Sequence, residues 1–160
     1  MKKPRPLLSK IKSAEALAKT IKSTNKRTVF TNGCFDLIHK GHVSYLQKAR
    51  SLGDILIVAL NSDASVKRIK GPSRPLNSLK DRLEVMAALE SVDYVTWFSE
   101  DTPLKVIRLL GPKVLVKGGD WKIEQIVGAQ DVIARGGKVF SLPYVKGRST
   151  TRLLHKARAT

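Results

Sequence analysis

Short apolar runs alternate along this sequence with longer stretches of helical spacing, and this alternation constrains the fold more than any other feature. The runs are continuously apolar, which is typical of strands that are covered on both faces. Strands joined through helices form right-handed parallel βαβ units. We therefore expect an α/β fold, a Rossmann-like doubly wound parallel sheet of about five strands with helices on both faces.

The expected elements follow from this pattern. Strands are predicted at 27–31, 54–60, 94–98, 114–116 and 138–142, and helices at 41–52, 78–90, 102–110, 123–135 and 149–158. Before the first strand, helical spacing after a capping Ser13 predicts one more helix. We expect a basic N-terminal extension over 1–26 that carries this helix, followed by the main domain over 27–160.

The net charge of +17 raises the possibility of a polyanionic partner, but the charge is unevenly distributed. Residues 1–30 hold nine Lys or Arg and one acid, and residues 146–160 hold five and none. Aromatic residues make up 6% and form no stripe with basic ones, so we expect no specific nucleic-acid partner. A nucleic-acid-binding module stays as an alternative, which predicts RNA binding that survives deletion of 1–26.

Apolar length and cysteine content exclude other classes. No run approaches the ~18 apolar residues that span a membrane, so we expect no membrane partner and a cytoplasmic location. A single cysteine, Cys34, excludes an internal disulfide framework and a multi-cysteine zinc site.

The turn after the first predicted strand, from Thr31 to His42, carries the strongest chemical signal. Gly33 and Gly41 permit close approach of the backbone, and the following helix start favours an anion. His39 and His42 fall on one side of that helix start, where both could donate to one phosphate chain. The alternatives are a capping His39 with a half-buried His42, or a zinc site that adds Asp36.

Other predicted strand ends add anion-binding groups. The last turn contains Arg148, Ser149 and Thr150 before the final helix, which makes a second candidate cradle. The loop from Lys117 to Trp121 is equally consistent with an ordinary turn. Asn61–Asp63 follows the second strand, and 67–75 with its glycine and prolines predicts a structured loop rather than a helix. We expect phosphate binding there by some of Lys70, Arg74 and Arg82.

Four motifs in order, TNGCFDLIHKGHVSYL, LIVALNSDASVKRIKGPSRPLN, VLVKGGDW and GRSTT, resemble the HxGH nucleotidyltransferase superfamily over residues 27–157. Among its branches the sequence is most similar to the heptose 1-phosphate adenylyltransferases, in a stand-alone form. The resemblance implies transfer of AMP from ATP to a heptose 1-phosphate, which gives ADP-heptose and pyrophosphate for the lipopolysaccharide inner core. The alternatives are a glycerol-3-phosphate cytidylyltransferase-like enzyme that uses CTP, and a silent nucleotide-binding homologue.

The resemblance also implies the roles of individual residues. The implied catalytic residues are His39, His42, Lys70 and Arg82. The implied nucleotide-binding residues are Asn32, Gly33, Cys34, Phe35, Gly41, His42, Lys117, Gly118, Asp120, Ser149, Thr150 and Thr151. The implied substrate-binding residues are Asp36, Asn61, Asp63, Lys70 and Arg74.

The resemblance further implies Mg²⁺ bound mainly through the ATP phosphates, no protein metal ligands and a homodimer. Related sequences often carry an aliphatic residue at position 34, and the Cys34 thiol is expected to act as a small hydrophobe. A nucleophilic thiol is the alternative, although no His–Asp pair is placed to activate it.

Overall fold

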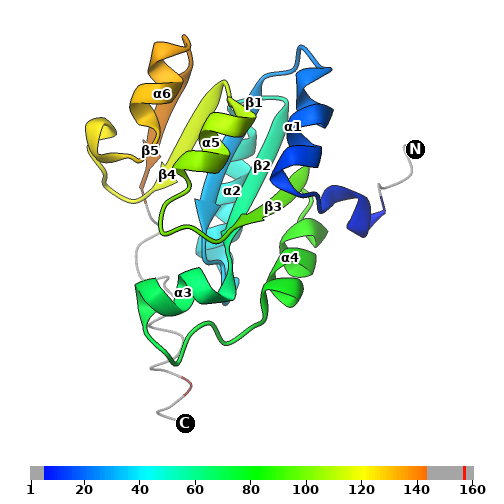
Figure 1. Ribbon diagram of the computed structural model, residues 1–160, viewed down its shortest axis with the longest axis vertical. Coiled ribbons are helices and arrows are strands. Elements are labelled where there is room, and N and C mark those ends of the chain that lie inside the picture. Colours follow the sequence, from blue (N-terminus) through cyan, green and yellow to red (C-terminus); the bar gives the residue numbers. More distant parts are fainter. Residues whose placement is uncertain (1–5, 144–156, 158–160) are drawn as a thin grey trace.

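The computed structural model describes residues 6–143 and 157. It contains five parallel strands, β1 (Thr28–Gly33), β2 (Ile55–Asn61), β3 (Tyr94–Phe98), β4 (Val114–Gly118) and β5 (Lys138–Leu142). Their order in the sheet is β3-β2-β1-β4-β5, with every neighbouring pair parallel (Figure 1). The predicted α/β class and all five predicted strands are confirmed.

Helices cover both faces of the sheet. On one face Phe30, Ile57 and Leu115 pack with α1 (Ala14–Lys22), α5 (Leu104–Leu110) and α6 (Ala129–Ala134). On the other face Val29 and Leu56 pack with α2 (Lys40–Arg50) and α4 (Leu79–Ala88). Successive strand residues point to opposite faces, so each continuously apolar strand feeds two cores.

The N-terminal residues pack against this domain. Ser13 caps α1 by accepting a hydrogen bond from the Ala16 amide, as its sequence predicts, and Leu17 is fully buried in the core. Before α1, a short helix η1 (Leu7–Lys10) leads to Ile11, which forms a parallel bridge with Val95 at the sheet edge. The segment expected as a basic extension therefore contributes to the core and to the sheet edge.

Two predicted segments differ in the structure. The loop expected over 67–75 is wrong for its first part, because α3 (Asp63–Lys70) runs through it before ending at Gly71. The Ser62 hydroxyl accepts a hydrogen bond from the Ser65 amide and starts this helix. The helix expected over 123–135 is a short turn, η2 (Ile123–Gln125), followed by α6, because Gly128 with φ 84° interrupts it. The helix expected over 149–158 falls almost entirely outside the described residues.

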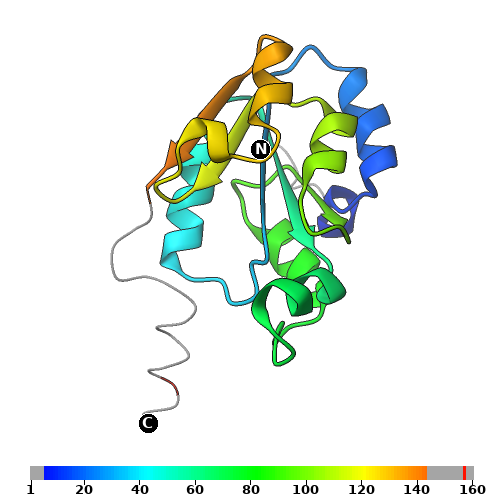
Figure 2. The same cartoon turned by 60° about the vertical axis from the view of Figure 1, so that its left-hand side comes forward.

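The topology fixes where a ligand can approach the sheet. The strand order reverses at β1, which lies between β2 and β4, and open α/β sheets bind ligands beyond the carboxyl ends at such a point. In Figures 1 and 2, α3 lies beyond the carboxyl end of the sheet, toward the bottom of the view. Among the described residues, no helix has the length and apolar character to cross a membrane.

Candidate active site

The turn after β1 folds back on itself. Phe35 has φ 45°, and its buried ring lies so close to Gly33 that a Cβ there would be 2.9 Å from the ring. Glycine at position 33 therefore lets the phenyl ring pack under the turn. The same ring makes an edge contact with His42, with ring centroids 5.2 Å apart. Packing of Phe35 thus fixes one side of the histidine pair.

His39 and His42 lie on one side of the start of α2, as their spacing predicts, and the structure shows that their rings stack. Their ring centroids are 3.9 Å apart, with an angle of 20° between the rings. His39 caps α2, and its Nδ1 accepts a hydrogen bond from the Gly41 amide at 3.1 Å. We assign the proton of neutral His39 to Nε2 for this reason.

The second ring of the pair is desolvated. Nδ1 of His42 is buried and has no hydrogen-bond partner among the described residues. Burial, and then the charge of protonated His39, lower the pKa of His42 to about 4; the backbone of Leu37 opposes this shift, and Lys70 adds to it. His42 is therefore neutral at pH 7 in the free protein, and an anion beside it would favour its protonation.

Two lysines flank the histidine turn. Lys70, the last residue of α3, is exposed, and its charge lies close enough to act on both His42 and Cys34. Lys117, near the end of β4, is half-buried and makes no hydrogen bond or ion pair with a described residue. Burial lowers the pKa of Lys117, and the Cys34 side chain lies within electrostatic reach. The structure thus brings Lys70, Lys117 and the two histidines to one region.

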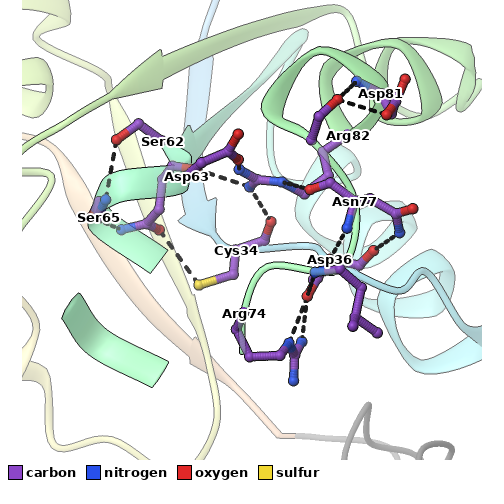
Figure 3. A network of polar contacts seen from close by, with 12 residues as sticks. Cys34, Asp36, Ser62, Asp63, Ser65, Arg74, Asn77, Asp81 and Arg82 are labelled. Carbon is purple, nitrogen blue, oxygen red and sulfur yellow. Dashed lines mark hydrogen bonds and ion pairs between the residues drawn. The ribbon is translucent and has the colours of Figure 1, made fainter. Parts of the chain in front are cut away.

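Arg82, expected among the catalytic residues, lies inside the protein with 2% of its surface exposed. Its Nη1 donates to the carbonyl oxygens of Cys34 at 2.7 Å and Asn61 at 2.9 Å (Figure 3). Its Nη2 donates to Oδ1 of Asp63 at 2.7 Å, and its Nε to the Asn77 carbonyl at 3.1 Å. Four of the five N–H groups of the guanidinium therefore point at this chain's own oxygens.

Asp36 and Arg74, expected to bind substrate, also bind each other. Asp36 is 4% exposed, and its Oδ2 accepts hydrogen bonds from Nη2 of Arg74 at 2.6 Å and Nε at 2.7 Å (Figure 3). The amides of Leu76 and Asn77 donate to the same carboxylate at 2.9 Å. Burial alone would raise the pKa of Asp36, but these amides and Arg74 hold it below its usual value. The carboxylate therefore points inward, at the segment before α4.

The last residue of β2, Asn61, contacts both Cys34, in the turn after β1, and the buried Arg82. Asn61 is buried, donates to the Ser65 hydroxyl at 3.0 Å, and has its Oδ1 4.0 Å from the Cys34 sulfur. Burial raises the pKa of Cys34, so the group is a protonated thiol at pH 7. The side chain of Asp63 is 42% exposed and uses Oδ1 for Arg82.

The remaining expected residues lie in β1, in α2, at or after the end of β4, or outside the described residues. Asn32 is in β1, Gly41 is in α2, and the Gly118 carbonyl accepts a hydrogen bond from the Trp121 indole at 3.0 Å. Asp120 is exposed and makes no hydrogen bond or ion pair with any residue in 6–143. Ser149, Thr150 and Thr151 lie outside the described residues.

Sequence reasoning missed two residues that organise this region. The Nδ2 of Asn77 donates to the Asp36 carbonyl at 2.6 Å, and its own carbonyl accepts from Arg82. The Tyr45 hydroxyl lies 2.6 Å from the Thr31 hydroxyl and donates to the Val116 carbonyl at 3.3 Å, which joins α2 to β1 and β4. Both residues lie within motifs that carry the family resemblance, Asn77 at the end of the second and Tyr45 near the end of the first, but nothing in the sequence indicated these contacts.

The arrangement offers donors and positive charge rather than a metal cage. Within 6–143 and 157, no three His, Cys, Asp or Glu side chains are grouped to hold a metal ion. The stacked rings, two lysines and the start of an eleven-residue helix can together stabilise negative phosphate oxygens.

Relatives were found by sequence. The chain is 58% identical over 151 residues to the bifunctional protein HldE of Citrifermentans bemidjiense, and 52% identical over 154 residues to that of a Marinomonas species. These matches cover 92% and 96% of this chain and 31% of each relative. The chain thus spans about a third of the length of the curated relatives that it matches.

Solved structures agree with the fold. The lipopolysaccharide core biosynthesis protein of Thermoplasma volcanium superposes with a TM-score of 0.61 at 26% identity, covering 78% of this chain and all of that one. A pantoate-beta-alanine ligase from Francisella tularensis superposes with a TM-score of 0.60, covering 92% of this chain and 76% of the ligase. At 16% identity this likeness shows a common fold alone.

The family described as cytidylyltransferase-like matches residues 30–155. The chain therefore belongs to the cytidylyltransferase-like family of HxGH nucleotidyltransferases, as its motifs indicate.

Proposed function

We propose that this domain transfers AMP from ATP to a heptose 1-phosphate and releases pyrophosphate. The observation that carries the proposal is the stacked pair of His39 and His42 at a helix start, with the buried Nδ1 of His42 lacking a partner among the described residues and with Lys70 and Lys117 near the same turn. The choice of a heptose rests on the motifs and on the similarity to HldE and to a lipopolysaccharide core biosynthesis protein.

The proposed reaction is a direct in-line displacement. An oxygen of the sugar phosphate forms a bond to the α-phosphorus of ATP, and the bond from that phosphorus to the bridging oxygen breaks, so pyrophosphate leaves with the electron pair. A phosphate monoester is already anionic at pH 7, so no general base is needed. The barrier is electrostatic, and positioning with positive charge lowers it.

The chain's own groups match this requirement. Nε2 of His39 donates to a phosphate oxygen, and His42 gains a proton when negative charge approaches its ring. Lys70 and Lys117 balance the charge of the two polyanions. In the acceptor site, the exposed carboxylate of Asp63 accepts hydrogen bonds from sugar hydroxyls through the oxygen that Arg82 leaves free.

Divalent metal use is general in this family, and we propose Mg²⁺ for this chain. Asp36 is saturated by protein donors, and the free oxygen of Asp63 is assigned to the sugar, so neither carboxylate serves as a metal ligand in this proposal. The described residues therefore fit Mg²⁺ coordinated mainly by phosphates and water. When bound, the ion neutralises charge on the triphosphate.

The test is a pyrophosphate-release assay of the purified protein with each nucleoside triphosphate and a panel of sugar and polyol phosphates. Release with ATP and heptose 1-phosphate alone is expected. Release with CTP and glycerol 3-phosphate, or none with any pair, would overturn the proposal.

We further propose a cytoplasmic homodimer, for which light scattering in solution should give twice the mass of 17.7 kDa.

A further inference from the structure

Arg82 projects from α4 into the junction between two strand ends. It joins the carbonyl of Cys34, in the turn after β1, to the carbonyl of Asn61, the last residue of β2. It also holds the carboxylate of Asp63 at the start of α3. Figure 3 shows the guanidinium between these groups, which come from separate segments of the chain.

This geometry removes Arg82 from direct contact with substrate. Only 1% of its side chain is exposed, and four of its N–H groups already have oxygen acceptors. A phosphate could reach the guanidinium only after these hydrogen bonds were broken inside the protein, which leaves buried acceptors without donors. Apart from the field of its charge, any effect of Arg82 on the reaction must therefore pass through the groups that it holds.

The segment before α4 also binds the turn after β1, through Arg74 and Asn77. Asn77 accepts from Nε of Arg82 and donates to the carbonyl of Asp36, while Arg74 pairs with the carboxylate of Asp36. The turn between Cys34 and Asp36 is thus held by the buried Arg82, the half-buried Arg74 and one amide. The backbone from this turn leads directly into the histidine pair, and Phe35 within it contacts His42.

We propose that Arg82 is a positioning residue: it fixes the turn after β1 against the end of β2, and through that turn it sets the place of His39 and His42. The inference deepens the proposed nucleotidyl transfer and rests on it. It assigns Arg82 a role different from the catalytic one that the family resemblance implies.

The test compares Arg82→Lys with a matched control, Arg50→Lys. Arg50 also joins two segments, pairing with Asp93 at 2.8 Å and donating to the Gly53 carbonyl, but it does so beside the amino end of β2. Both substitutions keep the charge and lose the planar fork. All rates are measured at least 20 °C below the melting temperature of each variant, so that loss of folded protein does not enter.

For R82K we expect kcat to fall about 30–100-fold, with KM for ATP and for heptose 1-phosphate within about threefold of wild type. R50K should lower the melting temperature and leave kcat within about twofold. Because R82K could reduce the yield of folded protein, Arg82→Gln is measured in parallel. For this variant too we expect kcat to fall while both KM values stay within about threefold of wild type.

A second readout is coupling to the histidines. If Arg82 acts by placing the turn, His39→Ala should cost less than about tenfold in kcat in the R82K background, against about 10²–10³ in the wild type. Additive losses, an unchanged kcat in both Arg82 variants, or a KM increase with kcat retained would overturn the inference. An inactive wild-type protein would instead refute the proposed function.

Discussion

Two groups of polar side chains lie at the carboxyl end of the sheet, and they differ in where their hydrogen bonds go. In the anchored cluster, Asp36, Arg74, Asn77 and Arg82 bind one another and the backbone. In the open cluster, His39, His42, Lys70 and Lys117 lie close together, and a ring nitrogen of His42 and the amine of Lys117 have no partner among the described residues. The contrast separates groups that hold the turn from groups available to an anion.

A buried group without a partner destabilises the folded protein unless a ligand supplies one. The open cluster contains such groups, and the anchored cluster does not. Substitution in the open cluster should therefore affect the reaction more than stability, and substitution in the anchored cluster should do the reverse, except where it displaces the histidine turn. The predictions below test this division.

The largest expected effect is on turnover. His39→Ala and His42→Ala should each lower kcat about 10²–10³-fold, because each ring is expected to act on charge that develops in the transition state. The melting temperature should change little for His42→Ala, whereas His39→Ala should also lower the free energy of unfolding by about 1 kcal/mol, because it removes the cap of α2. Steady-state kinetics with thermal melting of the same samples checks both parts. Near-normal turnover in either variant would break the comparison.

The next effect is on stability. Asp36→Asn removes the charge that Arg74 pairs with inside the protein, and it should cost about 3 kcal/mol in the free energy of unfolding. For a chain of 160 residues this corresponds to roughly 10 °C in melting temperature. Urea unfolding measures it, with Asp131→Asn in the exposed Arg108–Asp131 pair as control. Equal effects at the two sites would contradict the division.

Lys117→Met should separate binding from folding in one variant. The amine is half-buried without an ion pair among the described residues, so an apolar side chain of similar length should leave the melting temperature unchanged or raise it. The value of kcat/KM for ATP should fall about tenfold, because one positive charge near the phosphates is lost. Lys113→Met, at an exposed position before β4, is the matched control. A destabilised K117M would show that the amine has a structural partner.

The smallest effect is a pH dependence. The pKa of His42 is about 4 in the folded protein, below its ordinary value of 6.5, so the unfolded chain binds more protons between these pH values. Stability should therefore fall as the pH drops from 6.5 toward 4. His42→Asn removes this component, and the difference in unfolding free energy between variant and wild type at pH 7 and pH 5 measures it. A pH-independent difference would reject the desolvated histidine.

Much of the fold was predictable because every strand has a mostly apolar centre and most helices between the strands show helical spacing of apolar residues. The placement of both histidines on one side of a helix start was also predictable from their three-residue spacing, but the stacking of their rings was not predicted. The anchored cluster was not. The burial of Arg82 and Asp36 depends on contacts between segments about 40 residues apart, such as Asp36 with Arg74, and a basic residue beyond a strand end has the same appearance in sequence whether it faces solvent or a carbonyl.

The segment after β2 shows the same limit. Gly71, Pro72 and Pro75 correctly indicate a break in helical structure, but they end α3 rather than prevent it, because Ser62, nine residues before Gly71, caps the start of the helix. Helix-breaking glycines and prolines locate the end of a helix, but they do not show how far the helix extends before them.

The most direct test of the central claim follows the label from ATP carrying ³²P at the α-phosphate in a single turnover with heptose 1-phosphate. The wild-type protein should transfer the label to ADP-heptose, and the His42→Ala variant, with ATP bound at a comparable Kd, should transfer it at least about 100-fold more slowly. Equal rates in the two proteins, or label that stays in ATP with the wild type, would contradict the account.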